Sequence, residues 1–574
     1  MPMRPDCVTF NQTGTGALRS QSKNTSGLPN PVLECADLMD SALRNLPSRP
    51  SLKAWAALEV LLIIGSYLLT LALAAACAYA PFWLIENGVS GNGQVLLLLI
   101  GGLVIAVTLL WSLVPRREQF KAPGPRLDSS SQPRLFAEVQ RLATTLREPM
   151  PQEIYIIPDL NAAVTERGGV MGFGSRRVMF LGLPLLQVLT VAQFCAVVAH
   201  EFGHYYGGDT RLGPWVYKAR GAMVRTIGGL GEPNAALGAL ARFAVVRLVH
   251  WAVIKILVAY WTLFLRITQL ISRRQEFRAD ELACHATGSQ ALIEGLRGLH
   301  GAAAALPAYQ TELEQVLTAG YRPAIAEGFA RFIAVPPIAE AISSQLDKAL
   351  KEGRTNPYDS HPPLRDRIAR AQRLPTGEAP RADPPGISLI DDVASVEVQI
   401  LQHLNPNRKV TELKPASWEQ VGTEVWMPQW KRLAEEYAAP LKGTTVGSLQ
   451  EVVKDLNKIG SQIRDPKGML ITREQRTQRA GHLVGAAFAL ALSEAGWELH
   501  AGPGELHLNR GADELNPFET VAQLASGALS AGSWLERSKA LGIENLPLGR
   551  SPARLEASAP LPPQSSSSSS SSHP

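Results

Sequence analysis

The sequence predicts a mainly α-helical fold with a small β-sheet, an α+β protein held in a membrane by an N-terminal helical hairpin. Two long uncharged runs follow a polar leader, and segments of helical period dominate the middle of the chain. Only two short stretches, EIYIIPD and RRVMFLG, have the β-branched and aromatic content of strands. At 574 residues the chain exceeds one ordinary domain, so at least one further module is expected.

The composition limits the kind of partner. The net charge of +5 is small for this length and the basic residues are scattered, so no nucleic-acid interface is expected. The five cysteines include no Cys-x-x-Cys pair, which argues against a disulfide framework and against a cysteine zinc site. A reducing compartment fits this cysteine usage.

The two uncharged runs are long enough to cross a bilayer. Val60 to Leu84 and Val95 to Val114 contain no charged residue, and a hydrocarbon core needs about 20 residues. Two buried helices of a soluble protein are the alternative. The positive-inside tendency puts both flanks of the pair in the cytoplasm, because each flank carries basic residues: Arg44, Arg49 and Lys53 before the pair, and Arg116, Arg117 and Lys121 after it.

Shifts in composition divide the chain into six expected parts. They are a disordered leader (1–50), the transmembrane hairpin (51–117), a globular domain (118–375), a Pro- and Gly-rich linker (376–386), a C-terminal domain of unassigned role (387–545) and a disordered Ser/Pro-rich tail (546–574). The apolar run at 483–492 is too short to span a bilayer.

A two-histidine motif lies in the stretch AVVAHEFGHYYGGD, residues 196–209. His200 and His204 are four residues apart on a predicted helix, so their imidazoles share one face. With Glu201 they form the His-Glu-x-x-His pattern, in which two histidines hold zinc and the glutamate takes the proton of the attacking water. The alternative is a pair of core histidines beside a surface glutamate.

A second helical segment, SRRQEFRADELA at 272–283, offers a third ligand. Glu276 and Asp280 are one turn apart, so one carboxylate can reach a metal while the other holds a ligand histidine by its outer N–H. Alone, the segment reads as an exposed charged face. Beside the two-histidine motif, the metal interpretation is favoured, and three protein ligands leave zinc an open position for catalysis.

Four motifs in one order carry a resemblance: NAAV at 161–164, HEFGH at 200–204, SRRQEFRAD at 272–280 and SHPPLRDRI at 360–368. With them the chain resembles the membrane-associated zinc metallopeptidases, gluzincins that include the HtpX heat-shock protease and the CaaX prenyl proteases. The resemblance covers roughly residues 130–375, with the membrane hairpin in looser form. It implies a zincin-type metallopeptidase domain that holds one Zn²⁺ per chain.

The resemblance also implies a role for each matching residue. The metal ligands would be His200, His204 and Glu276, with Glu201 as the general base; His361 and Arg367 would stabilise the transition state, Asp280 would orient a ligand histidine, and Asn161 would bind substrate.

The expected function is therefore that of a membrane-anchored endopeptidase. It would hydrolyse peptide bonds of membrane or misfolded proteins at the cytoplasmic face of a membrane. By analogy with HtpX, this would be a bacterial inner membrane. Protein or peptide substrates and the lipid bilayer are the expected partners. An extended substrate could pair with a predicted edge strand near 178–181. The alternatives are a catalytically inactive membrane scaffold or adaptor, and a prenyl-protein-processing protease.

Residues 241–285 raise a question of topology. They contain no Pro or Gly and include the apolar run Leu248 to Leu265, which looks like a third span. A single crossing would separate the two histidines from Glu276. The sequence therefore predicts an amphipathic helix that packs on the catalytic domain or lies in the membrane interface. The competing interpretation is a partner crossing within 215–245 that completes a second hairpin.

Overall fold

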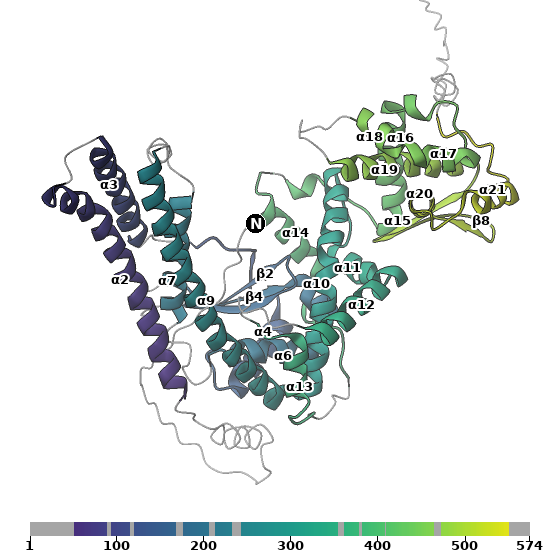
Figure 1. Cartoon of the computed structure of the whole chain (residues 1–574). Coiled ribbons are helices and arrows are strands. Elements are labelled where there is room, and N and C mark those ends of the chain that lie inside the picture. The colour runs from purple at the N-terminus through teal and green to yellow at the C-terminus, as the bar shows by residue number, and fades with distance from the viewer. Residues whose placement is uncertain are drawn as a thin grey trace, which may run out of the picture. The chain divides into compact units, whose positions relative to one another are not determined.

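The computed structural model describes residues 51–88, 93–114, 120–167, 176–205, 213–231, 243–353, 361–377, 382–407, 409–463 and 472–549. Over these residues the chain is mainly helical, with small β-sheets and long apolar N-terminal helices, which confirms the predicted fold class (Figure 1). The expected leader and the expected tail beyond residue 549 lie outside the described residues.

The chain divides into two compact units. Unit 1 contains Met1–Pro307 and Ala339–Val410, and unit 2 contains Ala308–Ile338 and Thr411–Pro574. This division differs from the boundary that composition suggests at 376–386. The end of that segment is bound to unit 1, because the carbonyl of Pro384 accepts from Val191 N–H at 2.9 Å and Gly386 N–H donates to the Leu189 carbonyl at 2.7 Å. Composition does not reveal such backbone pairing.

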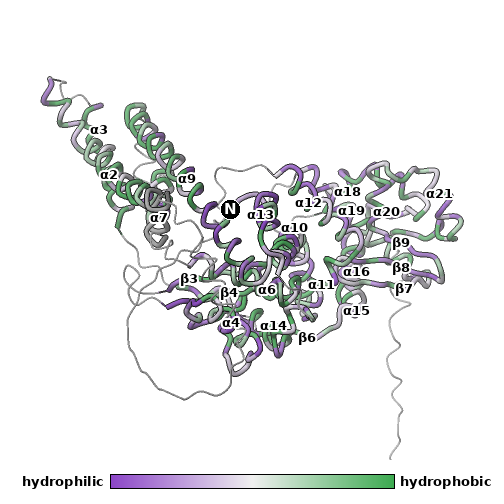
Figure 2. The backbone as a smooth tube through the Cα atoms, turned by 90° about the horizontal axis from the view of Figure 1, so that it is seen from below, coloured by the Kyte–Doolittle hydropathy of each residue, from purple (hydrophilic) through white to green (hydrophobic). Residues whose placement is uncertain are grey.

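Four helices of unit 1 form a bundle. The helices α2 (Ser51–Glu86), α3 (Gly93–Leu113) and α9 (Ala244–Thr287) are each long and apolar enough to cross a membrane, and α7 (Gly213–Gly231) packs against all three. The first two coincide with the runs expected to form a hairpin. Figure 2 shows hydrophobic residues along these helices.

The helices α7 and α9 run antiparallel. Met223, in the middle of α7, shares a core with Phe264, whereas Leu230, near the end of α7, shares one with Val253 and Leu257. The start of α7 and the second half of α9 therefore lie at the same end of the bundle. For this reason the two-histidine motif before α7 and the acidic motif late in α9 can meet on one side.

This arrangement corrects the preferred expectation for residues 241–285. Only the second half of α9 packs on α6 (Val191–Gly203), the helix of the two-histidine motif. The first half of α9 packs in the bundle. The competing interpretation, a helix pair with a partner in 215–245, describes the packing better. The sequence shows the apolar face of α9 but not that α2 and α3 are its neighbours.

The part of unit 1 outside the bundle contains a four-stranded sheet. Its order is β1 (Arg126–Leu127), β2 (Glu153–Ile157), β4 (Arg176–Gly182), β3 (Ala162–Arg167). The strand β4 pairs parallel with β2 and antiparallel with β3, so it is interior and β3 is the edge. The prediction of an edge strand near 178–181 is therefore wrong, because strand order depends on pairings that the sequence does not display.

Unit 1 contains further described helices outside the bundle. They are α4 (Pro133–Thr145), α5 (Leu183–Val188), α6, α13 (Leu364–Ala371) and α14 (Val393–Leu404), while α10 (Ser289–Thr318) and α12 (Pro336–Glu352) each have residues in both units.

Unit 2 is organised around a buried helix. In α19 (Arg473–Glu494) every residue from Leu483 to Leu492 is buried, so the apolar run is a domain core. It packs against α16 (Met427–Glu436), α18 (Leu456–Gln462), α20 (Pro517–Ser526) and β8 (Glu505–Arg510). The unit also contains α11 (Ile325–Ala334), α15 (Trp418–Val421), α17 (Leu449–Val452), α21 (Ala531–Ala540), the parallel pair β5 (Tyr321–Arg322) and β6 (Lys414–Pro415), and the antiparallel sheet in which β8 pairs with β7 (Glu498–Gly502) and β9 (Asp513–Leu515).

Residues 308–338 belong to unit 2 because they pack on it. The buried indole N–H of Trp418 donates to the Ala324 carbonyl at 2.8 Å, and Arg331 pairs with Glu419 at 2.7 Å. These contacts join residues about ninety positions apart, so no local pattern in the sequence predicts them.

We expect Gly102→Leu to destabilise the bundle, because a side chain at Gly102 would overlap the backbone carbonyl of Cys77 in α2. Overpacking of this kind costs about 1–3 kcal/mol. Thermal unfolding of the detergent-solubilised protein measures the effect. Gly93→Leu is the matched control, since a Cβ there meets nothing within 4 Å. Equal melting of the two variants would contradict the close approach of α2 and α3.

We expect a pH-dependent contact at Glu312, whose carboxylate accepts from the N–H of Gly504 in the β7–β8 turn at 3.0 Å. Burial raises the pKa of Glu312 from 4.5 to about 7, although this hydrogen bond lowers it. Since the folded pKa exceeds the unfolded one, the stabilisation is full below about pH 4.5 and is lost as the pH rises through 7, at a cost on the order of 1–3 kcal/mol.

Glu312→Gln keeps an acceptor and cannot ionise. We therefore expect slower hydrogen exchange of the β7–β8 amides in this variant than in the wild type at pH 8, and similar exchange at pH 4.5. An equal difference at both pH values would exclude the carboxylate charge as the cause.

Candidate active site

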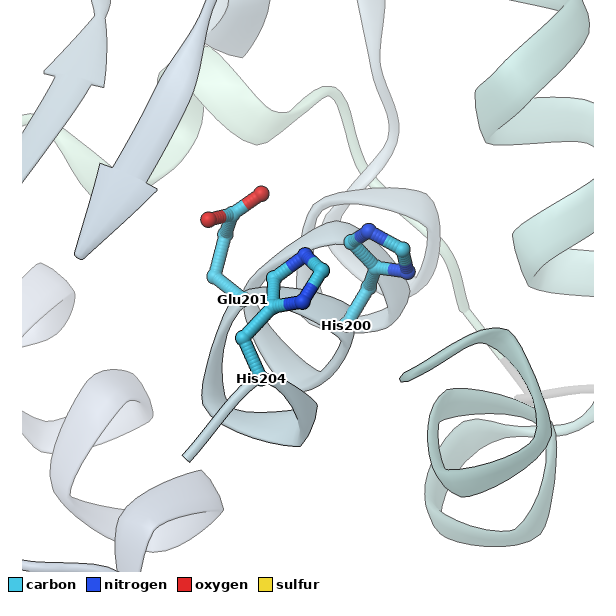
Figure 3. A group of neighbouring side chains, drawn as sticks. All are labelled: His200, Glu201 and His204. Atoms are coloured by element: carbon cyan, nitrogen blue, oxygen red, sulfur yellow. The ribbon is translucent and has the colours of Figure 1, made fainter. Parts of the chain in front are cut away.

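The two-histidine motif lies on α6, and a capping box stabilises the N-terminus of this helix. The Thr190 hydroxyl accepts from Gln193 N–H, and the Gln193 side chain accepts from Thr190 N–H. His200 lies in the last turn and His204 is the C-cap residue. Figure 3 shows both imidazoles on one side of the helix. Their ring centroids are 4.8 Å apart.

A glycine inside the motif lets α6 approach α9 closely. A Cβ at Gly203 would lie 2.8 Å from Cα of Ala279, closer than real Cβ contacts occur. This crossing brings Glu276 and Asp280, on either side of Ala279, against the histidines. Sequence reasoning missed this role of Gly203, although a glycine inside a buried helix is itself a signal of close packing.

The acidic motif supplies a carboxylate between the two imidazoles. Glu276 Oε2 lies 3.5 Å from His200 Nε2, and Glu276 Oε1 lies 3.6 Å from His204 Nε2. Donors that hold one tetrahedral zinc ion at about 2.1 Å are about 3.4 Å apart. Glu276 Oε2 is buried and also lies 2.9 Å from His361 Nδ1. The donor set therefore fits a zinc ion.

Asp280 holds the outer side of the first histidine. Its Oδ1 lies 2.9 Å from His200 Nδ1, and Arg367 binds both of its oxygens, at 2.6 and 2.9 Å. Burial alone would raise the pKa of Asp280, but the Arg367 charge and hydrogen bonds, with the one to His200, lower it to about 2. Asp280 is therefore ionised and fixes the orientation of the imidazole.

The pKa shifts of His200 and Glu276 show that the space between the candidate ligands favours positive charge. Burial lowers the pKa of His200, but hydrogen bonds with Asp280 and Glu276 outweigh it and raise this pKa to about 9. Burial would raise the pKa of Glu276, but hydrogen bonds with His200 and His361 hold it well below 4.5. Burial lowers the pKa of His204 to about 4. A cation bound here would replace the charge that His200 otherwise carries.

Glu201 lies beside the histidines and near the sheet edge. One of its carboxylate oxygens and a ring nitrogen from each of His200 and His204 all lie within 4.8 Å of one another. Burial raises the pKa of Glu201 to about 7, and a hydrogen bond with the backbone of Val164, in the edge strand β3, lowers it. Figure 3 shows the carboxylate reaching away from the helix beside the two rings.

The two residues expected to stabilise a transition state have different surroundings. His361 precedes α13 and is 64% exposed, with Nδ1 2.9 Å from Glu276 Oε2. Arg367 is only 11% exposed and is committed to Asp280, while its Nη1 is 3.7 Å from Glu276 Oε2. A contact missed by sequence reasoning, Arg370 stacked 3.6 Å over the Phe277 ring, helps to fix α13 on α9.

Asn161 lies immediately before β3 and is exposed. Its backbone carbonyl accepts from Gly182 N–H at 2.8 Å, which joins the start of β3 to the end of β4. This contact explains its position in the fold. The substrate-binding role of its side chain stays a prediction.

Comparison with known proteins gives a consistent result. Residues 129–374 match peptidase family M48. The chain is 30% identical over 258 residues to a protease HtpX homolog of Acaryochloris marina, covering 42% of this chain and 72% of the relative. It is 27% identical over 228 residues to protease HtpX of Idiomarina loihiensis, covering 37% of this chain and 75% of the relative. No solved structure is significantly similar.

The match spans the four motifs, from the strand before NAAV to the helix that contains Arg367. It ends before Thr411, where the chain enters the larger part of unit 2. The chain belongs to peptidase family M48, among its HtpX-type zinc metallopeptidases.

Proposed function

We propose that this protease is a zinc-dependent endopeptidase that is anchored in a membrane and cuts membrane or misfolded proteins. One observation carries the proposal. A buried carboxylate, Glu276, faces the Nε2 atoms of His200 and His204 at 3.5 and 3.6 Å, the spacing of tetrahedral zinc ligands. Proteins pair or coordinate such buried charges.

His200, His204 and Glu276 would hold one zinc ion per chain. When bound, zinc supplies a Lewis acid that lowers the pKa of a water ligand toward about 7 and polarises the scissile carbonyl. Asp280 keeps His200 in the tautomer whose Nε2 is free to bind, because it accepts the Nδ1 proton at 2.9 Å.

Glu201 would act as the general base. It accepts the proton of the attacking water and passes it to the leaving amine. Burial supports this role, because it raises the pKa of Glu201 to about 7. A general base is most effective when its pKa lies near the pH at which the enzyme works.

His361 is the better of the two candidates for stabilising the oxyanion. Its imidazole is exposed beside Glu276 and can donate to charge that develops in the transition state. Arg367 is a positioning residue in this proposal, because its guanidinium binds Asp280 through two hydrogen bonds. It acts through Asp280 on His200.

The edge of β3 would bind the substrate backbone. The hydrogen bond between Val164 and Glu201 indicates that the unpaired edge of β3 faces the catalytic carboxylate. Backbone groups of Ala162 and Glu166 face the same way, since alternate residues of an antiparallel strand share an edge. An extended substrate could add as a further strand there, and Asn161 would contact it at one end. Selectivity would be broad.

We further propose that α2 with α3, and α7 with α9, form two membrane hairpins with the catalytic domain on the cytoplasmic side. The basic flanks of the first pair support this side, and so does the antiparallel packing of the second pair. By analogy with the relatives named HtpX, the membrane would be a bacterial inner membrane. An inactive scaffold is disfavoured because each catalytic role has a residue. Prenyl-protein processing has no specific observation in its favour.

We expect Glu201→Gln to bind zinc like the wild type and to lose hydrolysis by at least about 100-fold, because the amide has nearly the same shape but cannot accept a proton. Metal analysis and cleavage of casein by the purified full-length protein test this expectation. Glu294→Gln is the control, because Glu294 is a half-buried glutamate on α10 that pairs with Arg297 and is not part of the site. Wild-type turnover in Glu201→Gln would refute the assigned base.

We expect Glu276→Ala to lose zinc almost completely and Asp280→Ala to weaken zinc binding by about 10 to 100-fold, since the first removes a ligand and the second removes its orienting partner. Competition with a chelator of known affinity measures both variants, and circular dichroism checks their folding. Full zinc occupancy in Glu276→Ala would mean that another residue is the third ligand.

A further inference from the structure

The helix α9 has two opposite faces with different neighbours. One face carries Val246, Val253, Leu257 and Phe264, which are buried in the bundle. On the opposite face, at about 100° per residue, three polar residues fall within about 40° of one another. These are Lys255, Thr262 and Arg266, which we name the polar stripe; Lys255 and Arg266 are exposed and Thr262 is half-buried.

Lys255 lies at a depth where a charge is costly. Its neighbours Val253 and Leu257 share a core with Ile105 and Leu109 of the candidate span α3. The surrounding outer surface is apolar, with Trp251 57% and Ile256 45% exposed, and the Lys255 ammonium lies 5.9 Å from the centre of the Trp251 ring. A lysine within the hydrocarbon costs about 2.5–3.5 kcal/mol on insertion scales, and such residues usually mark a functional path.

The polar stripe leads to the catalytic centre. Further along α9 the same face is buried at Gln269, Arg273, Glu276 and Asp280, against the catalytic part. From Lys255 to Glu276 the helix rises about 30 Å, at about 1.5 Å per residue. One face of a single helix therefore leads from the apolar bundle to the proposed zinc ligands.

The described bundle helices of a second copy of this chain offer no matching charge. The described residues of α2, α3, α7 and the first half of α9 contain two acidic residues, Glu59 and Glu86. They lie near opposite ends of α2, away from the level of Lys255, whose neighbours share a core with Ala74 and Cys77. Phosphate groups of lipids lie at the interface, about 16 Å along the helix axis from Lys255 if they contact Arg266.

We propose that the polar stripe docks a membrane-spanning segment of the substrate that carries a carboxylate within its span, and delivers the adjoining cytoplasmic segment to the active site. The carboxylate would neutralise Lys255, and Arg266 would contact acidic or polar groups nearer the cytoplasm. This proposal rests on the proposed protease function and defines the substrate class more narrowly: membrane proteins with an acidic residue exposed to lipid, as in an unassembled subunit.

Cleavage in proteoliposomes tests the proposal. Two model substrates share a cytoplasmic extension and one membrane span, which carries either Asp or Leu at its centre, and casein is the soluble substrate. We expect the wild type to cleave the Asp substrate about tenfold better than the Leu substrate. Lys255→Met should abolish this preference and leave casein cleavage unchanged. Ile256→Met, an exposed neighbour, is the matched control.

A charge swap makes the test specific. Lys255→Glu should prefer a substrate with Lys in place of Asp at the centre of its span. A retained preference for Asp in Lys255→Met would overturn the proposal, and so would an equal loss of casein cleavage, which would indicate a structural role. If the effect of Lys255→Met appears only in vesicles with anionic lipid, the stripe binds headgroups and the proposal is likewise overturned.

Binding can be tested without turnover. In the Glu201→Gln background, Ala259→Cys, an exposed position one turn after Lys255, should form a disulfide with a cysteine beside the substrate Asp, and Lys255→Met should reduce this cross-linking. Absence of the cross-link refutes docking. Failure of wild-type casein cleavage with an intact cross-link would instead refute the proposed protease function.

Discussion

The close crossing of α6 and α9 is the contact on which the catalytic centre depends. Glycine at position 203 lets the helix backbones approach, because a Cβ there would lie 2.8 Å from Cα of Ala279. At this separation Glu276 reaches both Nε2 atoms and Asp280 reaches Nδ1 of His200. The proposed metal donors thus come from two packed helices, whose backbones are more rigid than loops. A small shift of either helix would change all of these distances together.

Because α9 is continuous over 44 residues, the same element also joins the catalytic centre to the membrane bundle. Its apolar face stabilises the bundle through Val253, Leu257 and Phe264, and its opposite face stabilises the site through Glu276 and Asp280. Burial in two cores fixes the rotation of α9 about its axis. The helix could not turn Glu276 away from the histidines without removing its bundle face from its neighbours, so anchoring and catalysis share one constraint.

Local patterns in the sequence were sufficient for the candidate spans α2 and α3, the helix α6, and the approach of Glu276 to the histidines. Each depends on spacing within a few turns or on a motif with known chemistry. The sheet order, the membership of 308–338 in unit 2 and the bundle position of α9 were not predictable in this way. They depend on contacts between segments far apart in the chain, such as Trp418 with Ala324. The motif also does not show that the Arg367 guanidinium already binds Asp280. Its expected role in the transition state stays a prediction.

The position of Arg367 has a physical reason in the path of the chain. Between Glu276 and α13 the chain passes through residues 308–338 of unit 2 and then returns. Closing such a long excursion costs entropy, although the cost grows only slowly with length. Two contacts hold the returning helix on α9: Arg367 binds both oxygens of Asp280, and Arg370 stacks on Phe277. Arginine suits this position better than lysine, because its planar guanidinium binds a carboxylate through two parallel hydrogen bonds. By binding Asp280 in this way, Arg367 brings His361 beside Glu276 and keeps the carboxylate that orients His200 ionised.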